Sequence, residues 1–167
     1  MLACSRLKQQ KNCLVLSIEP SRENLDCLKE NVKRFKLKNV VIIGKALSNK
    51  IGSDYLLLGK RSGTSQLAFI SKPPEPVKGR MEVEVDTLDN IVSQLKVPRI
   101  DLLKVDVEGA ELEVLKGAEE SLKITRNIAM ELHFESCRVK EYLEKRGFEN
   151  MMYARKVGVC DKGNLPL

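Results

Sequence analysis

The chain has 167 residues, of which 43% are hydrophobic and 31% are charged. This length and composition suffice for one domain with a substantial core, so we expect a single domain over residues 1–167. No apolar run approaches the roughly 20 residues that span a bilayer, and residues 1–11 lack the long apolar centre of a secretory signal. We therefore expect a cytoplasmic protein without membrane contact.

The five cysteines and the net charge of +6 bear on which kinds of binding site the protein has. The cysteines are odd in number, far apart and without a Cys-x-x-Cys pair, which argues against a disulfide framework or a zinc site and favours small buried thiols. The densest basic run, residues 29–38, falls at an expected helix end, where cations complement the helix dipole. Because only 4% of residues are aromatic, a solvated helix end is favoured over a nucleic-acid interface.

Strand-like apolar runs alternate with amphipathic helices, which predicts an α/β fold with a mostly parallel sheet and helices on both faces. The main strands are expected at residues 13–18, 40–43, 100–105 and 128–132. Helices are expected after the N-cap candidates Ser21 and Thr87, after Gly109, and over residues 137–146 before the C-cap Gly147. Residues 49–80 form a turn-rich insertion with short strands at 55–58 and 66–70, and residues 148–154 and 157–160 form an antiparallel closing pair.

Each of the first three helices presents apolar residues at helical spacing, which predicts that one face of each is buried. These faces are Leu25, Leu28, Val32 and Phe35 in the first helix, Leu88, Ile91, Val92 and Leu95 in the second, and Leu112, Leu115, Ala118 and Leu122 in the third.

The most informative stretch is residues 102–111, where an apolar run ends in Asp106 and Glu108 before helical periodicity resumes after Gly109. Ligands of open α/β sheets lie outside the carboxyl ends of the strands, so both carboxylates stand at the expected ligand-binding edge. A structural interpretation stays open for each. Asp106 would cap the helix that follows, and Glu108 would be favoured by the helix dipole.

Glu19 ends the first expected strand and precedes Pro20, a position from which acidic residues commonly accept hydrogen bonds from a cofactor ribose. Such a residue normally follows a glycine-rich turn by about 20 positions. The first glycine of this chain is Gly44, however, and none of its ten glycines is spaced Gly-x-Gly. We expect a nucleoside-bearing cofactor, with residues 1–10 as the remainder of the helix that follows the glycine turn.

The string Lys-x-Asp-x-Glu-Gly-Ala-Glu at residues 104–111 is specific rather than generic. The accompanying segments are Ile18-Glu19-Pro20-Ser21, Leu28-Lys29-Glu30-Asn31-Val32, Asn39-Val40, Ala46-Leu47-Ser48, Thr87-Leu88-Asp89 and Leu115-Lys116-Gly117-Ala118. Through these segments the chain resembles the FkbM family of S-adenosylmethionine-dependent methyltransferases, from about residue 13 to residue 148.

The resemblance implies a Rossmann-like class I methyltransferase fold and methyl transfer to a hydroxyl oxygen of a sugar or another small molecule. It also implies S-adenosyl-L-methionine as the cofactor. Glu19 and the adjoining Pro20 would hold the cofactor ribose, Ala46 and Leu47 would lie against the adenine, and Asp106 would sit near the methionine end.

A hydroxyl is a poor nucleophile near neutral pH, so a base or a cation that favours the developing alkoxide would help the transfer. Glu108 and His133 are the candidate bases, Lys104 is the candidate cation, and Glu131 is a weaker candidate. The structural alternatives stay open here too. Lys104 lies in an expected buried strand and would need a partner there, and His133, the single histidine, would be hydrogen-bonded structure at a strand tip.

The glycine-rich Asp-x-Gly-Ala-Asn-x-Gly loop of the family has no counterpart in this sequence. Three explanations stay open: the loop is encoded just upstream of Met1, or the protein keeps the fold as a non-catalytic binding or structural remnant, or a partner chain, as in a homo-oligomer, completes a shortened enzyme. The strand before that loop would lie between the strands ending at Ile18 and Val105. We expect these two strands to pair directly, or residues 1–11 to rearrange, or a second copy to cover the exposed edge.

Overall fold

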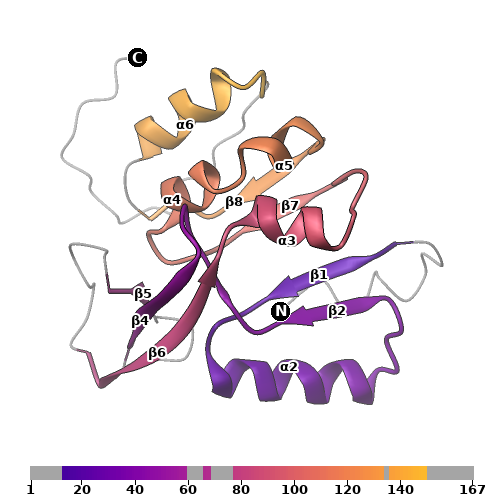
Figure 1. Cartoon of the computed structure of the whole chain (residues 1–167), viewed down its shortest axis with the longest axis vertical. Helices are drawn as coiled ribbons and strands as arrows, with labels where there is room; N and C mark the ends of the chain where they lie inside the picture. The colour runs from indigo at the N-terminus through magenta and orange to yellow at the C-terminus, as the bar shows by residue number, and fades with distance from the viewer. Residues whose placement is uncertain (1–12, 60–65, 69–76, 134–135, 150–167) are drawn as a thin grey trace, which may run out of the picture.

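The computed structural model describes residues 13–59, 66–68, 77–133 and 136–149. Its strands are β1 (Val15–Ile18), β2 (Val40–Ile43), β3 (Ala46–Leu47), β4 (Gly52–Leu58), β5 (Gln66–Leu67), β6 (Gly79–Asp86), β7 (Leu103–Val105) and β8 (Ile128–Met130). Its helices are α2 (Arg22–Arg34), α3 (Leu88–Gln94), α4 (Glu111–Lys116), α5 (Glu119–Lys123) and α6 (Ser136–Glu144). The fold is mixed α/β (Figure 1).

The described strands form three separate hydrogen-bonded groups rather than one continuous sheet. β1 pairs with β2 and β7 with β8, both in parallel, whereas the four-stranded group has the order β3-β6-β4-β5 with antiparallel β4–β6 and β4–β5 pairs. Among the described strands, β1 and β7 are therefore not directly paired. Of the three arrangements expected for the strands that end at Ile18 and Val105, direct pairing is wrong, and the other two stay predictions.

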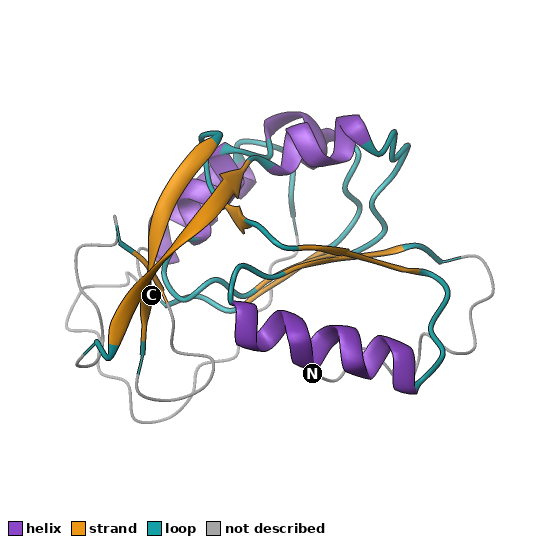
Figure 2. Ribbon diagram, turned by 60° about the horizontal axis from the view of Figure 1, so that its bottom comes forward, coloured by secondary structure: helices purple, strands orange, loops and turns teal. Residues whose placement is uncertain are grey.

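The unit β1-α2-β2 has a helix along its two strands, as Figures 1 and 2 both show. Ser21 is the N-cap residue, as expected, but its side chain makes no capping hydrogen bond. The prediction that one face of this helix is buried overestimates the burial. No residue of α2 is buried, and Phe35, at the C-cap, is 44% exposed. The helix therefore rests loosely on its strands within the described part of the chain.

The insertion after β3 is more regular than expected. β4 is longer than the predicted strand 55–58, and β6, a strand of eight residues, was not predicted at all. Its sequence Met-Glu-Val-Glu-Val alternates with period two, which is the signal of a half-buried strand. Its inward side chains Val83 and Val85 form a small core, and the other members are Ala46, Leu56 and Leu67.

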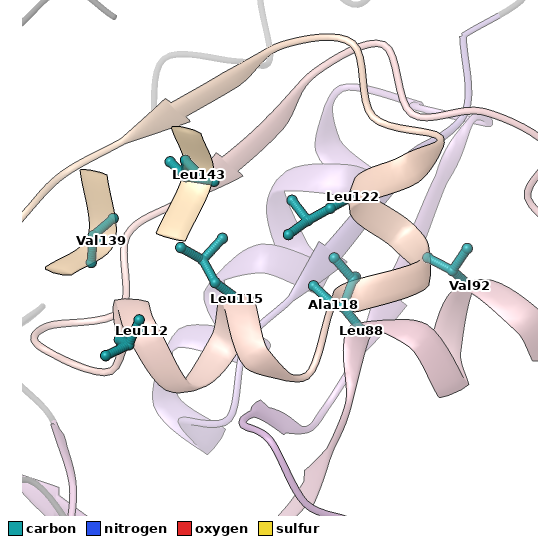
Figure 3. Packing of buried hydrophobic residues seen from close by; sticks show 8 residues of the cluster. All are labelled: Leu88, Val92, Leu112, Leu115, Ala118, Leu122, Val139 and Leu143. Carbon is teal, nitrogen blue, oxygen red and sulfur yellow. The ribbon is translucent and has the colours of Figure 1, made fainter. Parts of the chain in front are cut away.

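The main core lies between α3, α4, α5 and α6 (Figure 3). It confirms the predicted stripe after Gly109 in full, since Leu112, Leu115, Ala118 and Leu122 are all buried. The predicted face of α3 is buried except for Leu95, which is 43% exposed at the C-cap. Val139 and Leu143 of α6 close the cluster.

The single helix expected after Gly109 is divided into α4 and α5 at Gly117. A Cβ atom on Gly117 would lie 2.0 Å from the carbonyl oxygen of Ser48, so only glycine allows the chain after β3 to approach this turn. Asn49 adds a 2.5 Å hydrogen bond to Glu113 of α4. Two segments of the family resemblance, Ala46-Leu47-Ser48 and Leu115-Lys116-Gly117-Ala118, therefore meet here.

Several further expectations have mixed outcomes. The predicted strand 100–105 is shorter, because Ile100 makes only an isolated bridge to Thr125 before β7 begins. The expectation of buried thiols is wrong for Cys27 and Cys137, which are exposed. The expected closing pair at 148–154 and 157–160 lies outside the described residues from residue 150 onward, and so does the helical remainder at 1–10.

Within the described part of the chain, no helix is long and apolar enough to cross a membrane. The extent of a single domain over residues 1–167 stays a prediction.

Candidate functional site

Several acidic side chains lie at the carboxyl ends of β7 and β8, which pair in parallel. We call this part of the molecule, with Asp106, Glu108, Glu131 and His133, the acidic edge. Val105 pairs with Met130 at the last position of both strands, and the amide of Glu131 donates to the carbonyl of Val105 at 3.0 Å. Both chains therefore leave the sheet at the same edge, Asp106 following β7 and Glu131 following β8. Carboxyl ends of parallel strands are where ligands of such sheets bind.

Three potential ligand side chains converge at this edge. One donor atom each from Asp106, Glu108 and His133 lies within 4.8 Å of the other two. The imidazole Nε2 of His133 lies 3.4 Å from the Glu108 carboxylate and 3.8 Å from that of Glu131. Glu108 has a left-handed backbone conformation with φ of 51°, which costs free energy for a residue other than glycine. The structure therefore brings three of the predicted site residues together at one edge.

Glu111 fixes the histidine from the other side, and the sequence did not single it out as a site residue. Its side chain is only 1% exposed, and its Oε1 lies 2.7 Å from Nδ1 of His133. The same oxygen accepts a hydrogen bond from the amide of Gly109 at 3.0 Å. The signal was its place in Glu-Gly-Ala-Glu, where an acidic side chain begins α4 on the side that faces the core.

The electrostatics of the cluster are those of carboxylates in excess. Burial raises the pKa of Glu108; the neighbouring Asp106, Glu131 and Glu111 act in the same direction, while His133 opposes them. The hydrogen bond to Glu111 raises the pKa of His133, and the surrounding carboxylates add to this against the effect of burial. The site therefore favours positive charge.

Lys104 has a different environment from the one expected. Its side chain is 65% exposed rather than buried, because β7 pairs with only β8 among the described strands and leaves the lysine at an open edge. Its Nζ lies 2.8 Å from the carboxylate of Asp106. The proposed capping role of Asp106 is wrong, since Ala110 is the N-cap of α4 and no side chain caps it. Asp106 thus stays directed at the edge and paired with Lys104.

The expected cofactor residues Glu19, Pro20, Ala46 and Leu47 lie on other elements. Glu19 follows β1, its amide donates to the carbonyl of Ile43, and its carboxylate accepts from the amide of Ser21 at 2.8 Å. Ala46 and Leu47 form β3, with Ala46 buried in the small core and Leu47 packed against the main one. The described contacts do not join these residues to the acidic edge.

The segment Thr87-Leu88-Asp89 is explained by structure alone. Thr87 accepts a hydrogen bond from the amide of Asn90 and caps α3, as predicted. Asp89 accepts hydrogen bonds from the amides of Glu120 and Ser121 and so caps α5, which is a neighbouring helix. Asp89 therefore links α3 to α5, whereas neither Asp106 nor Glu108 caps α4.

A family model described as the methyltransferase FkbM domain matches residues 2–151. The chain belongs to the FkbM methyltransferase family. The match spans β1 to α6, so both the acidic edge and the segment with Glu19 lie within the FkbM domain.

Several curated relatives of this FkbM domain are named methyltransferases. The hexuronic acid methyltransferase AglP of Haloferax volcanii is 30% identical over 129 residues, which are 71% of this chain and 47% of AglP. The methyltransferase sdnD of Sordaria araneosa is 39% identical over 82 residues, or 42% of this chain and 32% of sdnD. The chain thus spans less than half the length of these relatives. No solved structure gives a significant match.

Proposed function

We propose that this FkbM domain transfers a methyl group from S-adenosyl-L-methionine to a hydroxyl oxygen of a small molecule, most simply a sugar acid or another carbohydrate. The convergence of Asp106, Glu108 and His133 at the shared end of β7 and β8 carries the proposal. The name of AglP supports a hexuronic acid as the first acceptor to test. The class I arrangement of the sheet is part of the same proposal.

The charge of the acidic edge fits the proposed cofactor. S-adenosyl-L-methionine supplies a methyl group on a positively charged sulfur, and the excess of carboxylates beside Asp106 favours a cation. Glu19 would accept hydrogen bonds from the ribose hydroxyls, with Pro20 fixing the turn, and Ala46 and Leu47 would line the adenine. Asp106 would face the methionine end.

The remaining residues of the edge would act on the acceptor. Glu108 or His133 would take the proton of the acceptor hydroxyl as the oxygen bonds to the methyl carbon and the bond from that carbon to sulfur breaks. The products would be a neutral methyl ether and S-adenosylhomocysteine. The raised pKa of Glu108 makes its carboxylate a better proton acceptor than an ordinary glutamate. Lys104, exposed beside Asp106, would favour a developing alkoxide or an acidic acceptor group.

A non-catalytic binding or structural role is the second candidate. The sequence contains no Gly-x-Gly spacing, and β1 and β7 are not paired among the described strands. Both observations concern the half of the site where the cofactor would bind. This candidate predicts that the folded chain has no affinity for S-adenosylhomocysteine.

Calorimetric titration with S-adenosylhomocysteine, followed by incubation with S-adenosyl-L-methionine and hexuronic acids, tests the proposal. We expect binding of one ligand per chain and a product heavier by one methyl group in mass spectrometry. Glu19→Gln should weaken cofactor binding about tenfold, which corresponds to about 1.4 kcal/mol. Asp101→Asn, which removes an exposed carboxylate paired with Arg99, is the matched control and should leave binding unchanged. A folded chain that binds no S-adenosylhomocysteine would instead support the non-catalytic role.

A further inference from the structure

The cluster at the acidic edge combines two carboxylates with one imidazole, all held by the ends of two neighbouring strands. We propose that Asp106, Glu108 and His133 bind a divalent metal cation of the Mn²⁺ type. Carboxylate oxygens suit Mg²⁺ and Mn²⁺, and an imidazole nitrogen suits transition metals, so Mn²⁺ satisfies both kinds of donor.

The spacing of the donor atoms is close to that of a coordination sphere. Metal–ligand bonds of about 2.0–2.2 Å place adjacent donors about 3 Å apart and opposite donors about 4.4 Å apart. Nε2 of His133 lies 3.4 Å from the Glu108 carboxylate, and all three donor atoms lie within 4.8 Å of one another. Small side-chain rotations would bring them into coordination, because Asp106 is 37% exposed and Glu108 is 25% exposed.

A buried carboxylate that is not one of the three donors, that of Glu111, contacts the other side of the histidine ring. Glu111, only 1% exposed, holds Nδ1 of His133 at 2.7 Å. A carboxylate accepts hydrogen bonds and does not donate them, so Nδ1 carries the proton and Nε2 is the nitrogen presented to Asp106 and Glu108. Metal-binding histidines are oriented in this way by a hydrogen bond from the other ring nitrogen.

The excess of carboxylates at the edge also favours the binding of a cation. Four carboxylates surround the imidazole, namely those of Asp106, Glu108, Glu111 and Glu131. Lys104, which pairs with Asp106, is 65% exposed, so its side chain can move away from Asp106 without disturbing the core. A divalent cation would neutralise the carboxylates of Asp106 and Glu108.

Three protein ligands leave coordination positions open for a substrate. The use of this cation in catalysis rests on the proposed function, whereas its binding does not. A cation here would hold the acceptor through two neighbouring oxygens, such as the hydroxyl and carboxylate of a sugar acid, and would lower the pKa of the bound hydroxyl. Glu108 and His133 would then be ligands rather than bases, and the proton of the metal-bound hydroxyl would pass to water.

The chain contains one histidine, which gives the experiment a single, assignable reporter. The purified chain, freed of metal with a chelator and without cofactor, would be titrated with Mn²⁺ while the NMR signals of the imidazole are recorded. We expect selective paramagnetic broadening of these signals at substoichiometric Mn²⁺ and a calorimetric stoichiometry of one ion per chain.

Asp106→Asn and Glu108→Gln keep side-chain size and remove one ligand each, and each should weaken Mn²⁺ binding at least tenfold. Asp101→Asn removes an exposed carboxylate elsewhere and should change nothing. Circular dichroism would show whether each variant is folded. Asp106 is partly exposed, so its variant keeps the experiment interpretable if Glu108→Gln does not fold.

The proposal is overturned if Mn²⁺ leaves the imidazole signals sharp, or if all three variants bind the ion equally. Failure of the proposed function looks different, because it is the loss of S-adenosylhomocysteine binding and methyl transfer with Mn²⁺ binding intact. Activity that survives complete chelation in a chain that binds Mn²⁺ would overturn the catalytic use of the cation and leave its binding standing.

Discussion

The two regions that carry the proposed ligand contacts are packed very differently. The acidic edge adjoins α4. This helix shares one cluster of eight buried hydrophobic residues with α3, α5 and α6. Glu19 lies instead in the unit β1-α2-β2, whose helix has no buried residue. Figure 2 shows α2 alongside β1 and β2, whereas Figure 3 shows the side chains of the main core converging from α3, α4, α5 and α6.

The difference indicates how the site is stabilised. Residues of the acidic edge adjoin elements that are packed into the main core, as preorganised sites require. The region around Glu19 has fewer buried contacts, so its local stability is expected to be lower and to depend more on what binds there. Mutations should therefore have larger effects in the first region than in the second.

Matched leucine-to-alanine changes test this difference with the largest expected effect. Leu115 is fully buried in α4, so Leu115→Ala should lower the free energy of unfolding by about 3–4 kcal/mol through lost contacts and a cavity. Leu28 in α2 is only half-buried, and Leu28→Ala should cost about 1 kcal/mol. Urea unfolding followed by circular dichroism measures both. Equal losses would show that α2 is packed as firmly as the main core.

The close approach of Ser48 to Gly117 links the chain after β3 to the main core and gives a second test. Gly117→Ala should destabilise the protein by about 2–3 kcal/mol, because the new methyl group would overlap backbone atoms that cannot rotate away. Gly79→Ala is the control, since a Cβ there meets nothing within 4 Å. Thermal unfolding of both variants measures the difference. A Gly117→Ala protein as stable as the control would contradict the contact.

Local sequence signals predicted much of this fold. The stripe from Leu112 to Leu122, the cap at Thr87 and the strand Val40–Ile43 follow from periodicity and capping chemistry, and the structure has all three. Burial was harder to predict, because it depends on elements distant in sequence. Phe35 fits the helical period of α2, yet it is exposed at a helix end where no other element covers it.

The candidate site was predictable in composition but not in geometry. The apolar run before Asp106 indicated a strand end, and the position of His133 after another run indicated its neighbour. Which side chains met depended on the register of β7 with β8, which a sequence does not specify. Glu111 was missed because a glutamate in the first turn of a helix ordinarily needs no explanation beyond the helix dipole.

The ion pair between Lys45 and Asp86 joins the two regions. Its removal should have the smallest effect on stability, with a pH dependence of definite sign. Lys45, which follows β2, donates to Asp86 at the end of β6 at 2.8 Å. Burial alone would raise the pKa of Asp86, but hydrogen bonds from Lys45, Asn90 and the amide of Thr87 outweigh it and lower that pKa. The hydrogen bond to Asp86 raises the pKa of Lys45.

Asp86→Asn should therefore lower the free energy of unfolding by about 1–3 kcal/mol at neutral pH. A carboxyl with a lowered pKa binds its proton less tightly in the folded than in the unfolded protein, so its contribution is present above the ordinary aspartate pKa of about 3.9 and falls as the pH drops through the folded value. The contribution of Lys45 is present below the ordinary lysine pKa of about 10.4 and falls as the pH rises through its raised value. Urea unfolding of wild type and variant across this range measures the difference in stability, which should be largest between these limits. A difference that is constant down to the acid limit would show that the Asp86 carboxylate contributes by its shape alone, and the two regions would then be joined by packing rather than by charge.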